Sequence, residues 1–486
     1  MGYVYEGLKP ANLWKNFASM NQIPRPSKHE DKIQAFAKKF GENLGLETII
    51  DEVGNIIIRK PATPGMENRM GLILQGHLDM VPQKNSDINH DFLNDPIKTY
   101  VEDGWVKAKG TTLGADNAIG VAAAMAVLEA NDIAHGPIEV LMTSDEETGM
   151  TGANNLKAGI LKGDILMNLD SEDEGELYIG CAGGVNTKVV FNYTEENVPA
   201  GMSAYKISVT GLKGGHSGLD INLGRGNANK IINRLMLNAS ERSGLRLASI
   251  DGGNMRNAIP REAFAVVVVP ESEKKEFISF VDEYFVFAKN ELKDSDPGLK
   301  VVIEQVGLPG SLIDAETQAN LFEAVNTCPN GVYAMSKDMP DLVETSSNLA
   351  IIKSENGKIE IASLQRSAVD SEKRKVAQEF YDAFTKVGGT AAFSGEYPGW
   401  KPNVNSPILK AMKEGYNAKF GKIPEVKVIH AGLECGILGS KYPNWDMISF
   451  GPTIRNPHSP DEMVNIKTVE LFWEFLLETL KNAPIR

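Results

Sequence analysis

The chain has 486 residues, 42% of them hydrophobic and 23% charged, which is enough for two or three domains with sizeable cores. Its formal net charge is −14, from 50 basic and 64 acidic residues without a basic stripe, so we expect no nucleic-acid partner. Neither a membrane-spanning apolar run nor a secretory signal is recognisable, so we expect a cytoplasmic protein with no membrane partner.

The first part of the chain, residues 1–186, alternates apolar runs with amphipathic stretches. Strands are predicted at Met70–Gln75, Ile138–Thr143 and Asp164–Leu169, with an Ala-rich helix at Ala118–Ala130 between the first two. Strands that alternate with helices are typical of a mainly parallel, twisted sheet with helices on both faces. We therefore predict an α/β domain for this part of the chain.

The pattern changes after residue 186. The predicted elements of this region are strands at Ala204–Thr210, Ala263–Val269 and Lys300–Val306, helices at Ala228–Asn238 and Glu273–Leu292, and a hairpin with Asn356-Gly357 at its turn within Leu349–Ser363. Residues 187–399 are therefore predicted to form an α+β insert. A Gly/Pro-rich linker at residues 389–402 would return the chain to the first domain, and hinges are expected there and at residues 186–200.

The last segment, residues 400–486, resumes the α/β pattern. Val426–Ile429 and Met447–Phe450 are predicted to be strands. This segment would complete the first domain, so that the insert becomes a lid over it.

Acidic residues and histidines follow the predicted strands of the first domain. These residues are His77 and Asp79 after the first strand, Asp116 before the Ala-rich helix, Glu146 and Glu147 after the second strand, Asp170 after the third, and His458 near the C-terminus. In open α/β sheets, the carboxyl ends of the strands are where sites assemble. We expect these side chains to converge on one crevice.

Each of these residues also has a purely structural explanation. Asp116 could cap the following helix, His77 could be a buried, hydrogen-bonded histidine, and Glu146 and Glu147 could be a solvated pair. Because such an explanation must hold independently at every strand end, the combination favours a metal site. Cys181, Cys328 and Cys435 are too scattered for a disulfide framework or a cysteine-based site.

Imidazole and carboxylate groups are suited to zinc. Two ions need a bridging group, and one carboxylate with two oxygens can serve. Asp79, two residues beyond His77, is placed to orient the imidazole. Because successive side chains diverge, one of Glu146 and Glu147 can bind metal while the other handles a proton.

The ordered motifs resemble those of metallopeptidase family M20, and more closely its aminoacyl-histidine dipeptidase (Xaa-His dipeptidase, peptidase D) branch. The family motifs are Gly76–Pro82, Thr112–Asn117 and Asp145–Ala153, and the branch is supported by Ile179–Gly184, Gly214–Gly218, Arg256–Pro260 and His430–Gly436. The resemblance implies two Zn²⁺ ions per chain, which Co²⁺ or Mn²⁺ can replace. It also implies hydrolysis of dipeptides with a free N-terminus, of the β-Ala-His type.

The resemblance assigns a role to each candidate residue. His77 and Asp170 would hold one zinc, Glu147 and His458 the other, and Asp116 would bridge them. Asp79 would orient His77, and Glu146 would be the general base. In the lid, His216, Asn257 and Arg366 would face the carbonyl and carboxylate of the peptide substrate, and a homodimer is expected from the likeness alone. Glu434 is a candidate partner for the free α-amino group of the substrate, with a structural role equally open.

Other functions of the same fold stay open at this point. A tripeptide aminopeptidase, a carboxypeptidase or an N-acyl amino acid deacylase would share the motifs, and activity on a dipeptide but not on its N-acetylated form would separate them. A non-catalytic binding protein is the remote alternative. A protein of that kind would be expected to have lost some metal ligands or the general base. In this sequence, every candidate position holds a residue type that can bind metal or transfer a proton.

Overall fold

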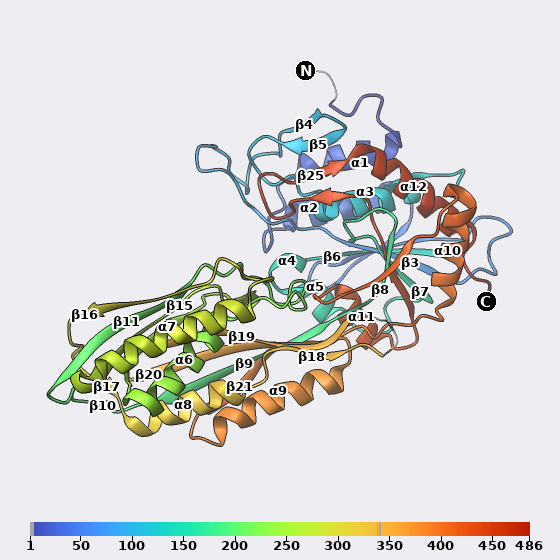
Figure 1. Ribbon diagram of the computed structural model, residues 1–486. Helices are drawn as coiled ribbons and strands as arrows, with labels where there is room; N and C mark the ends of the chain where they lie inside the picture. The colour runs from blue at the N-terminus through green and yellow to red at the C-terminus, as the bar shows by residue number, and fades with distance from the viewer. Residues whose placement is uncertain (1–3, 338, 340–341) are drawn as a thin grey trace. The chain divides into compact units, whose positions relative to one another are not determined.

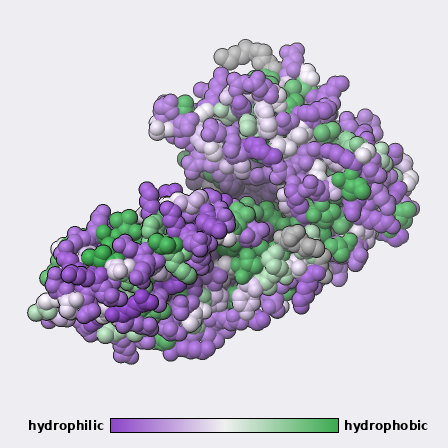
Figure 2. Space-filling model, viewed as in Figure 1, coloured by the Kyte–Doolittle hydropathy of each residue, from purple (hydrophilic) through white to green (hydrophobic). Residues whose placement is uncertain are grey.

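The computed structural model describes residues 4–337, 339 and 342–486. These residues form two compact units (Figure 1). The first unit contains the chain up to Gly180, Trp400–Val428 and Leu433–Arg486, and the second contains Cys181–Gly399 and Ile429–Gly432. Much of the surface seen in Figure 2 is hydrophilic. Within the described ranges, no helix combines the length and the apolar character needed to cross a membrane.

The first unit is built on a sheet whose strand order is β1-β2-β6-β3-β7-β23-β8-β22. Its strands are β1 (Glu47–Ile50), β2 (Ile56–Lys60), β3 (Leu72–His77), β6 (Ile138–Thr143), β7 (Ile165–Asn168), β8 (Glu176–Cys181), β22 (Glu425–Ile429) and β23 (Asp446–Ser449). The central strands β6, β3, β7 and β23 pair in parallel. The pairs β1–β2, β2–β6 and β23–β8 are antiparallel. The predicted α/β sheet is confirmed, with a parallel centre and antiparallel flanks.

Helices and a small second sheet complete the first unit. The helices are α1 (Ala11–Asn21), α2 (Asp31–Asn43), α3 (Ala115–Glu129), α4 (Glu146–Gly149), α5 (Thr151–Asn155), α10 (Pro407–Phe420), α11 (Glu434–Lys441) and α12 (Ile466–Lys481). The small sheet contains β4 (Thr99–Glu102), β5 (Trp105–Ala108), β24 (Ile454–Arg455) and β25 (Met463–Asn465). The Ala-rich α3 packs against both α1 and β3, so its side chains from Ala118 to Leu128 are buried.

The second unit is an antiparallel sheet with helices packed against it (Figure 1). Its main strands are β9 (Gly183–Asn192), β11 (Met202–Thr210), β13 (Arg246–Gly252), β15 (Ala263–Pro270), β16 (Lys300–Val306), β18 (Gly331–Met335), β19 (Val343–Glu355), β20 (Lys358–Ser367) and β21 (Thr390–Tyr397). Its helices are η1 (Glu271–Glu273), α6 (Ala228–Ser243), α7 (Lys274–Glu291), α8 (Ala315–Thr327) and α9 (Asp370–Thr385), and its short strands are β10 (Glu195–Glu196), β12 (Gly215–His216), β14 (Ala258–Ile259) and β17 (Leu312–Ile313). A core of apolar side chains fills the space between the helices and the sheet.

The predicted hairpin is confirmed. β19 and β20 pair antiparallel up to Glu355 and Lys358, which leaves Asn356 and Gly357 as a two-residue turn. Their φ angles are 52° and 74°, and such positive values at both positions are the reason that Asn-Gly is favoured in this turn.

The predicted linker at residues 389–402 is wrong over most of its length. Thr390–Tyr397 forms β21, which pairs antiparallel with β9. The hinge expected at residues 186–200 also begins inside a strand, because β9 runs from Gly183 to Asn192 and pairs with β20 as well. Backbone groups that are hydrogen-bonded within a sheet are poor hinges, so the glycine and proline content of residues 389–402 did not indicate flexibility.

The start of α3 lies directly against the end of β7. Asn117 Nδ2 donates to the Leu169 carbonyl oxygen at 2.7 Å. One turn later, a Cβ atom on Gly120 would lie 2.3 Å from the same oxygen. Only glycine allows this approach, which sets the position of Asp116 relative to Asp170.

Gly120→Ala is therefore expected to lower the thermal unfolding midpoint of the metal-free protein. The added methyl group must push α3 away from β7, and overpacking of this kind typically costs about 1–3 kcal/mol. Gly307→Ala is the control, because a Cβ atom there would have nothing within 4 Å. Equal midpoints for the two variants would show that the contact with Leu169 does not constrain the helix.

Candidate metal centre

The predicted strand ends bring the candidate residues to one edge of the first unit's sheet. His77 is the last residue of β3, Asp170 follows β7 by two residues, and Glu146 and Glu147 begin α4 just after β6. Because β3 pairs in parallel with both β6 and β7, the carboxyl ends of these strands lie at the same edge. Asp116 comes from the start of α3.

Two imidazoles lie on either side of the Asp116 carboxylate. Its Oδ1 is 2.9 Å from His77 Nε2, and its Oδ2 is 3.1 Å from His458 Nε2. Each imidazole nitrogen also faces a second carboxylate: His77 Nε2 is 3.5 Å from Asp170 Oδ1, and His458 Nε2 is 2.9 Å from Glu147 Oε2. The arrangement is thus two His-carboxylate groups that share Asp116.

The donor atoms of these groups are close enough to hold metal ions. In each of two sets, His77, Asp116 and Asp170, and Asp116, Glu147 and His458, the potential ligand atoms all lie within 4.8 Å of one another. Oε1 of Glu147 is buried and makes no hydrogen bond within the described chain. Imidazole nitrogens and carboxylate oxygens with unused lone pairs are a donor set that fits divalent transition metals.

The charges of the cluster also suit cations. Burial raises the pKa of Asp170 to about 7, opposed by His77 and reinforced by Asp116. Burial likewise raises the pKa of Glu146 well above its ordinary value. Hydrogen bonds to Asp116 and Glu147 raise the pKa of His458 to about 11. Without metal, therefore, protons neutralise this crowded set of carboxylates, and metal ions would displace those protons.

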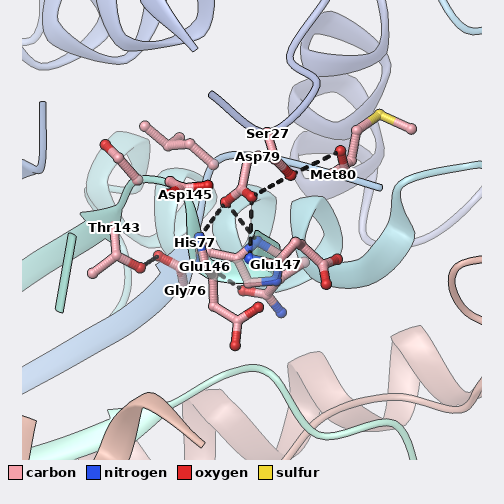
Figure 3. A network of polar contacts seen from close by, with 12 residues as sticks. Ser27, Gly76, His77, Asp79, Met80, Thr143, Asp145, Glu146 and Glu147 are labelled. Carbon is pink, nitrogen blue, oxygen red and sulfur yellow. Dashed lines mark hydrogen bonds and ion pairs between the residues drawn. The ribbon is translucent and has the colours of Figure 1, made fainter. Parts of the chain in front are cut away.

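Asp79 joins the ring of His77 to the start of α4 (Figure 3). Its Oδ1 lies 3.3 Å from His77 Nδ1 and accepts the backbone N–H of Glu146 at 3.0 Å. Its Oδ2 accepts from Ser27 Oγ at 2.8 Å and from the backbone N–H of Glu147 at 3.3 Å. Burial acts to raise the pKa of Asp79, but its hydrogen bond with His77 and the other donors lower it to about 2. Asp79 is therefore an anion that can fix the orientation of His77.

The adjacent glutamates have different surroundings. The carboxylate of Glu147 contacts His458, whereas the described hydrogen bonds of Glu146 are made by its backbone, through the N–H to Asp79 and the carbonyl oxygen from Met150. The Glu146 carboxylate nevertheless lies close enough to His77 and Glu147 to form a third possible metal-binding group. The division of roles between the two glutamates therefore stays a prediction.

Glu434 begins α11 and lies under the strand ends, with an exposed fraction of 1%. Its Oε2 accepts hydrogen bonds from Gln75 Nε2 at 2.6 Å and from Thr143 Oγ1 at 2.7 Å. Its Oε1 is buried and makes no hydrogen bond in the part of the chain that is described. Burial raises the pKa of Glu434 to about 7. One oxygen is thus held by β3 and β6, and the other is available to a donor.

The remaining candidates, His216, Asn257 and Arg366, lie in the second unit around Ser217. The Ser217 N–H donates to the Asn257 carbonyl oxygen at 2.8 Å, and Arg366 Nε lies 3.5 Å from Ser217 Oγ. Arg366 Nη1 also donates to Tyr397 Oη at 2.8 Å. Asn257, Arg366 and Tyr397 line a cavity of about 630 Å³ within this unit.

The backbone around His216 determines which ring nitrogen carries the proton. Its Nδ1 accepts the N–H groups of Gly218 at 3.2 Å and Leu219 at 3.0 Å, so Nδ1 is unprotonated. Burial and the nearby Arg366 charge lower the pKa of His216 to about 4. The imidazole is therefore neutral at pH 7 and has one donor, the Nε2–H.

Two charged residues beside the cluster, Arg25 and Glu462, were missed from the sequence. Both are buried in the first unit and bind the loops that carry the candidate ligands. The sequence does contain a signal for Glu462, because this residue follows the candidate ligand His458 by only four residues. Arg25 lies in Pro24-Arg25-Pro26, where only the tertiary structure reveals its burial.

Comparison with protein families and known proteins agrees with the geometry. Residues 73–482 match the model of Peptidase family M20/M25/M40. The cytosol non-specific dipeptidase of Escherichia coli (strain K12) is 45% identical over 479 residues, which cover 99% of each chain.

Solved structures give the same result. The aminoacylhistidine dipeptidase from Vibrio alginolyticus has a TM-score of 0.95 and 46% identity, covering 100% of this chain and 99% of that one. The aminopeptidase PepT from Bacillus cereus ATCC 10987 has a TM-score of 0.62 at 16% identity, covering 98% of this chain and 99% of that one, and shares the fold. The predicted fold class and the resemblance to family M20 are thereby confirmed. Because the family match spans most of the sequence and the bacterial relative is similar along its whole length, the chain belongs to Peptidase family M20/M25/M40, whose peptidases are metal-dependent hydrolases.

Proposed function

We propose that the chain is a di-zinc dipeptidase that hydrolyses dipeptides with a free N-terminus, including Xaa-His peptides of the β-Ala-His type. The observation that carries the proposal is the Asp116 carboxylate between His77 and His458, each of which faces a further carboxylate. The substrate class is supported by two relatives that are 45% and 46% identical to this chain, a cytosol non-specific dipeptidase and an aminoacylhistidine dipeptidase. Co²⁺ or Mn²⁺ would replace zinc.

The same five side chains that lie together would hold the ions. His77 and Asp170 would bind one, Glu147 and His458 the other, and Asp116 would bind both. When bound, the ions would polarise the carbonyl of the substrate and ease the loss of a proton from water. Asp79 would keep the His77 ring in the orientation and tautomer that ligation requires.

Glu146 would handle the proton. It is buried beside the cluster, and its described hydrogen bonds are both made through the backbone, so its carboxylate could accept a proton from the attacking water. It would then donate that proton to the leaving amine. Burial raises the pKa of Glu146, which makes its carboxylate a stronger base than a solvated one.

The second unit would supply groups that bind the substrate. His216 is neutral with a single Nε2–H donor, which suits the oxygen of the scissile carbonyl as negative charge develops on it. Arg366 would bind the substrate carboxylate through its planar fork, with Asn257 beside it. In the first unit, the unpaired Oε1 of Glu434 is suited to the free α-ammonium group.

A cytoplasmic location and a homodimer complete the proposal. The location is supported by the relative from Escherichia coli, which is described as a cytosol enzyme, and by three buried cysteines that form no disulfide with one another. The homodimer rests on the family likeness.

Hydrolysis of a small dipeptide panel after metal removal tests the proposed function. Chelator-treated protein is expected to be inactive, and zinc, cobalt or manganese should restore cleavage of β-Ala-His and other free dipeptides. N-acetylated dipeptides should be poor substrates, because they lack the ammonium group that Glu434 would bind. Full activity in protein shown to be metal-free by elemental analysis would refute the metal mechanism. Preference for the acetylated form would indicate a deacylase instead.

Substitution of the adjacent glutamates separates the proton carrier from the ligand. Glu146→Gln should keep both metal ions but lower kcat by about 10²–10⁴, the usual contribution of general acid–base catalysis. Glu147→Gln is the matched control at the neighbouring position and should lose metal from one site. Elemental analysis and steady-state kinetics of the two variants give the answer. If Glu146→Gln emptied a site while Glu147→Gln kept both ions, the two roles would be reversed.

A further inference from the structure

Two buried charged side chains of the first unit have no part in the proposed chemistry. The exposed fractions of Arg25 and Glu462 are 1% and 2%. We infer that they are positioning residues, which hold the turn Leu113–Asp116 by its peptide groups and so fix the shared carboxylate of Asp116. The inference rests on the proposed role of Asp116 as the bridging ligand.

Glu462 binds one side of this turn. Its Oε2 accepts the backbone N–H groups of Leu113 and Gly114, both at 2.8 Å. Its Oε1 accepts the backbone N–H of Asp116 at 3.2 Å. A single carboxylate therefore satisfies three peptide donors at the start of α3 that would otherwise be buried without partners.

The guanidinium group of Arg25 binds the same turn at a backbone carbonyl oxygen. Its Nη2 donates to the Gly114 carbonyl oxygen at 2.7 Å, and its Nη1 donates to the carbonyl oxygens of Leu78 at 3.2 Å and Asp79 at 3.1 Å. The Arg25 carbonyl in turn accepts the N–H of Met80 at 3.1 Å. The guanidinium thus ties the loop after β3, which follows His77, to the loop that carries Asp116.

Gly114 is the point at which the two side chains meet. Its N–H donates to Glu462, and its carbonyl accepts from Arg25. Its φ is 67°, and a Cβ atom would lie 2.5 Å from Arg25 Nη2, so glycine is required for both reasons. The two side chains are therefore connected through the peptide groups of one residue, and the charge of Glu462 opposes the lowering of the Arg25 pKa by burial.

Glu462 also connects the segment that carries His458 to the backbone of Asp116. It lies on the same short segment as His458, and its N–H donates to the Ser459 carbonyl oxygen at 3.0 Å. This segment therefore touches Asp116 twice, through the His458 ring at the carboxylate and through Glu462 at the backbone. Two attachments define both the position and the direction of the Asp116 side chain.

Such positioning matters because a bridging carboxylate must serve two ions at once. Productive ligand geometries tolerate errors of about 0.5 Å, and an unsupported turn with glycine at its centre can move by more. Substitution of supporting residues of this kind typically lowers metal affinity or activity by about 10–100-fold.

The test compares Glu462→Gln with Glu139→Gln. Glu139 is a matched control in the same unit: its Oε2 accepts the consecutive N–H groups of Lys162 and Gly163 at 2.6 and 2.8 Å, and its exposed fraction is 6%. It lies near the opposite end of β6 from the cluster. The readouts are zinc affinity, by competition with a chromophoric chelator, the visible spectrum of the Co²⁺-loaded protein, and the unfolding midpoint of the metal-free protein.

We expect Glu462→Gln to bind zinc about 10–100-fold more weakly than the wild type and to change the Co²⁺ spectrum, while Glu139→Gln lowers only the unfolding midpoint. A Glu462→Gln protein with wild-type zinc affinity and an unchanged Co²⁺ spectrum would overturn the inference. If that variant does not fold, Arg25→Lys decides by the same readouts, since it keeps the charge but loses the three-carbonyl fork. Wild-type protein that binds no zinc would instead refute the proposed function, which distinguishes the two failures.

Discussion

The Asp116 carboxylate lies between two imidazoles, 2.9 Å from His77 and 3.1 Å from His458 on opposite oxygens. Both rings and three further carboxylates are crowded around this one group, so its position constrains every other member of the cluster. Like charges at this density need protons or metal ions to neutralise them. The rest of the first unit supplies the means to hold Asp116 in place: β3 and β7 present its neighbours, and α3 presents Asp116 itself.

The parallel centre of the sheet explains why residues so far apart in sequence meet. β3, β6 and β7 end at one edge, and each delivers polar side chains at its last residue or within the next four. Below that edge, Glu434 is held by Gln75 and Thr143, the polar residues near the ends of β3 and β6. The second unit has a different design, because an antiparallel sheet and its turns fix His216 as a neutral donor through two backbone N–H groups.

Five strands of the first unit, β3, β6, β7, β22 and β23, could be predicted, because an apolar run marks a buried strand and the polar residues at its end are local in sequence. His77 and Asp170 are predictable in this way. The β21 strand was mistaken for a linker because its pairing with β9 depends on a distant partner, and the glycines and prolines in and around it suggested a loop. Arg25 and Glu462 were missed because charged loop residues are usually exposed. Both are buried because they bind peptide groups of the Leu113–Asp116 turn. A pattern of side chains in the sequence does not show which peptide groups need such partners.

The central claim is that Asp116 bridges two metal ions. Anomalous X-ray diffraction from crystals of the active, zinc-loaded protein, measured on both sides of the zinc absorption edge, tests it most directly. The account predicts two anomalous peaks roughly 3.5–4 Å apart, with one oxygen of Asp116 bound to each. A single peak in fully active protein, or two peaks of which Asp116 contacts only one, would contradict it.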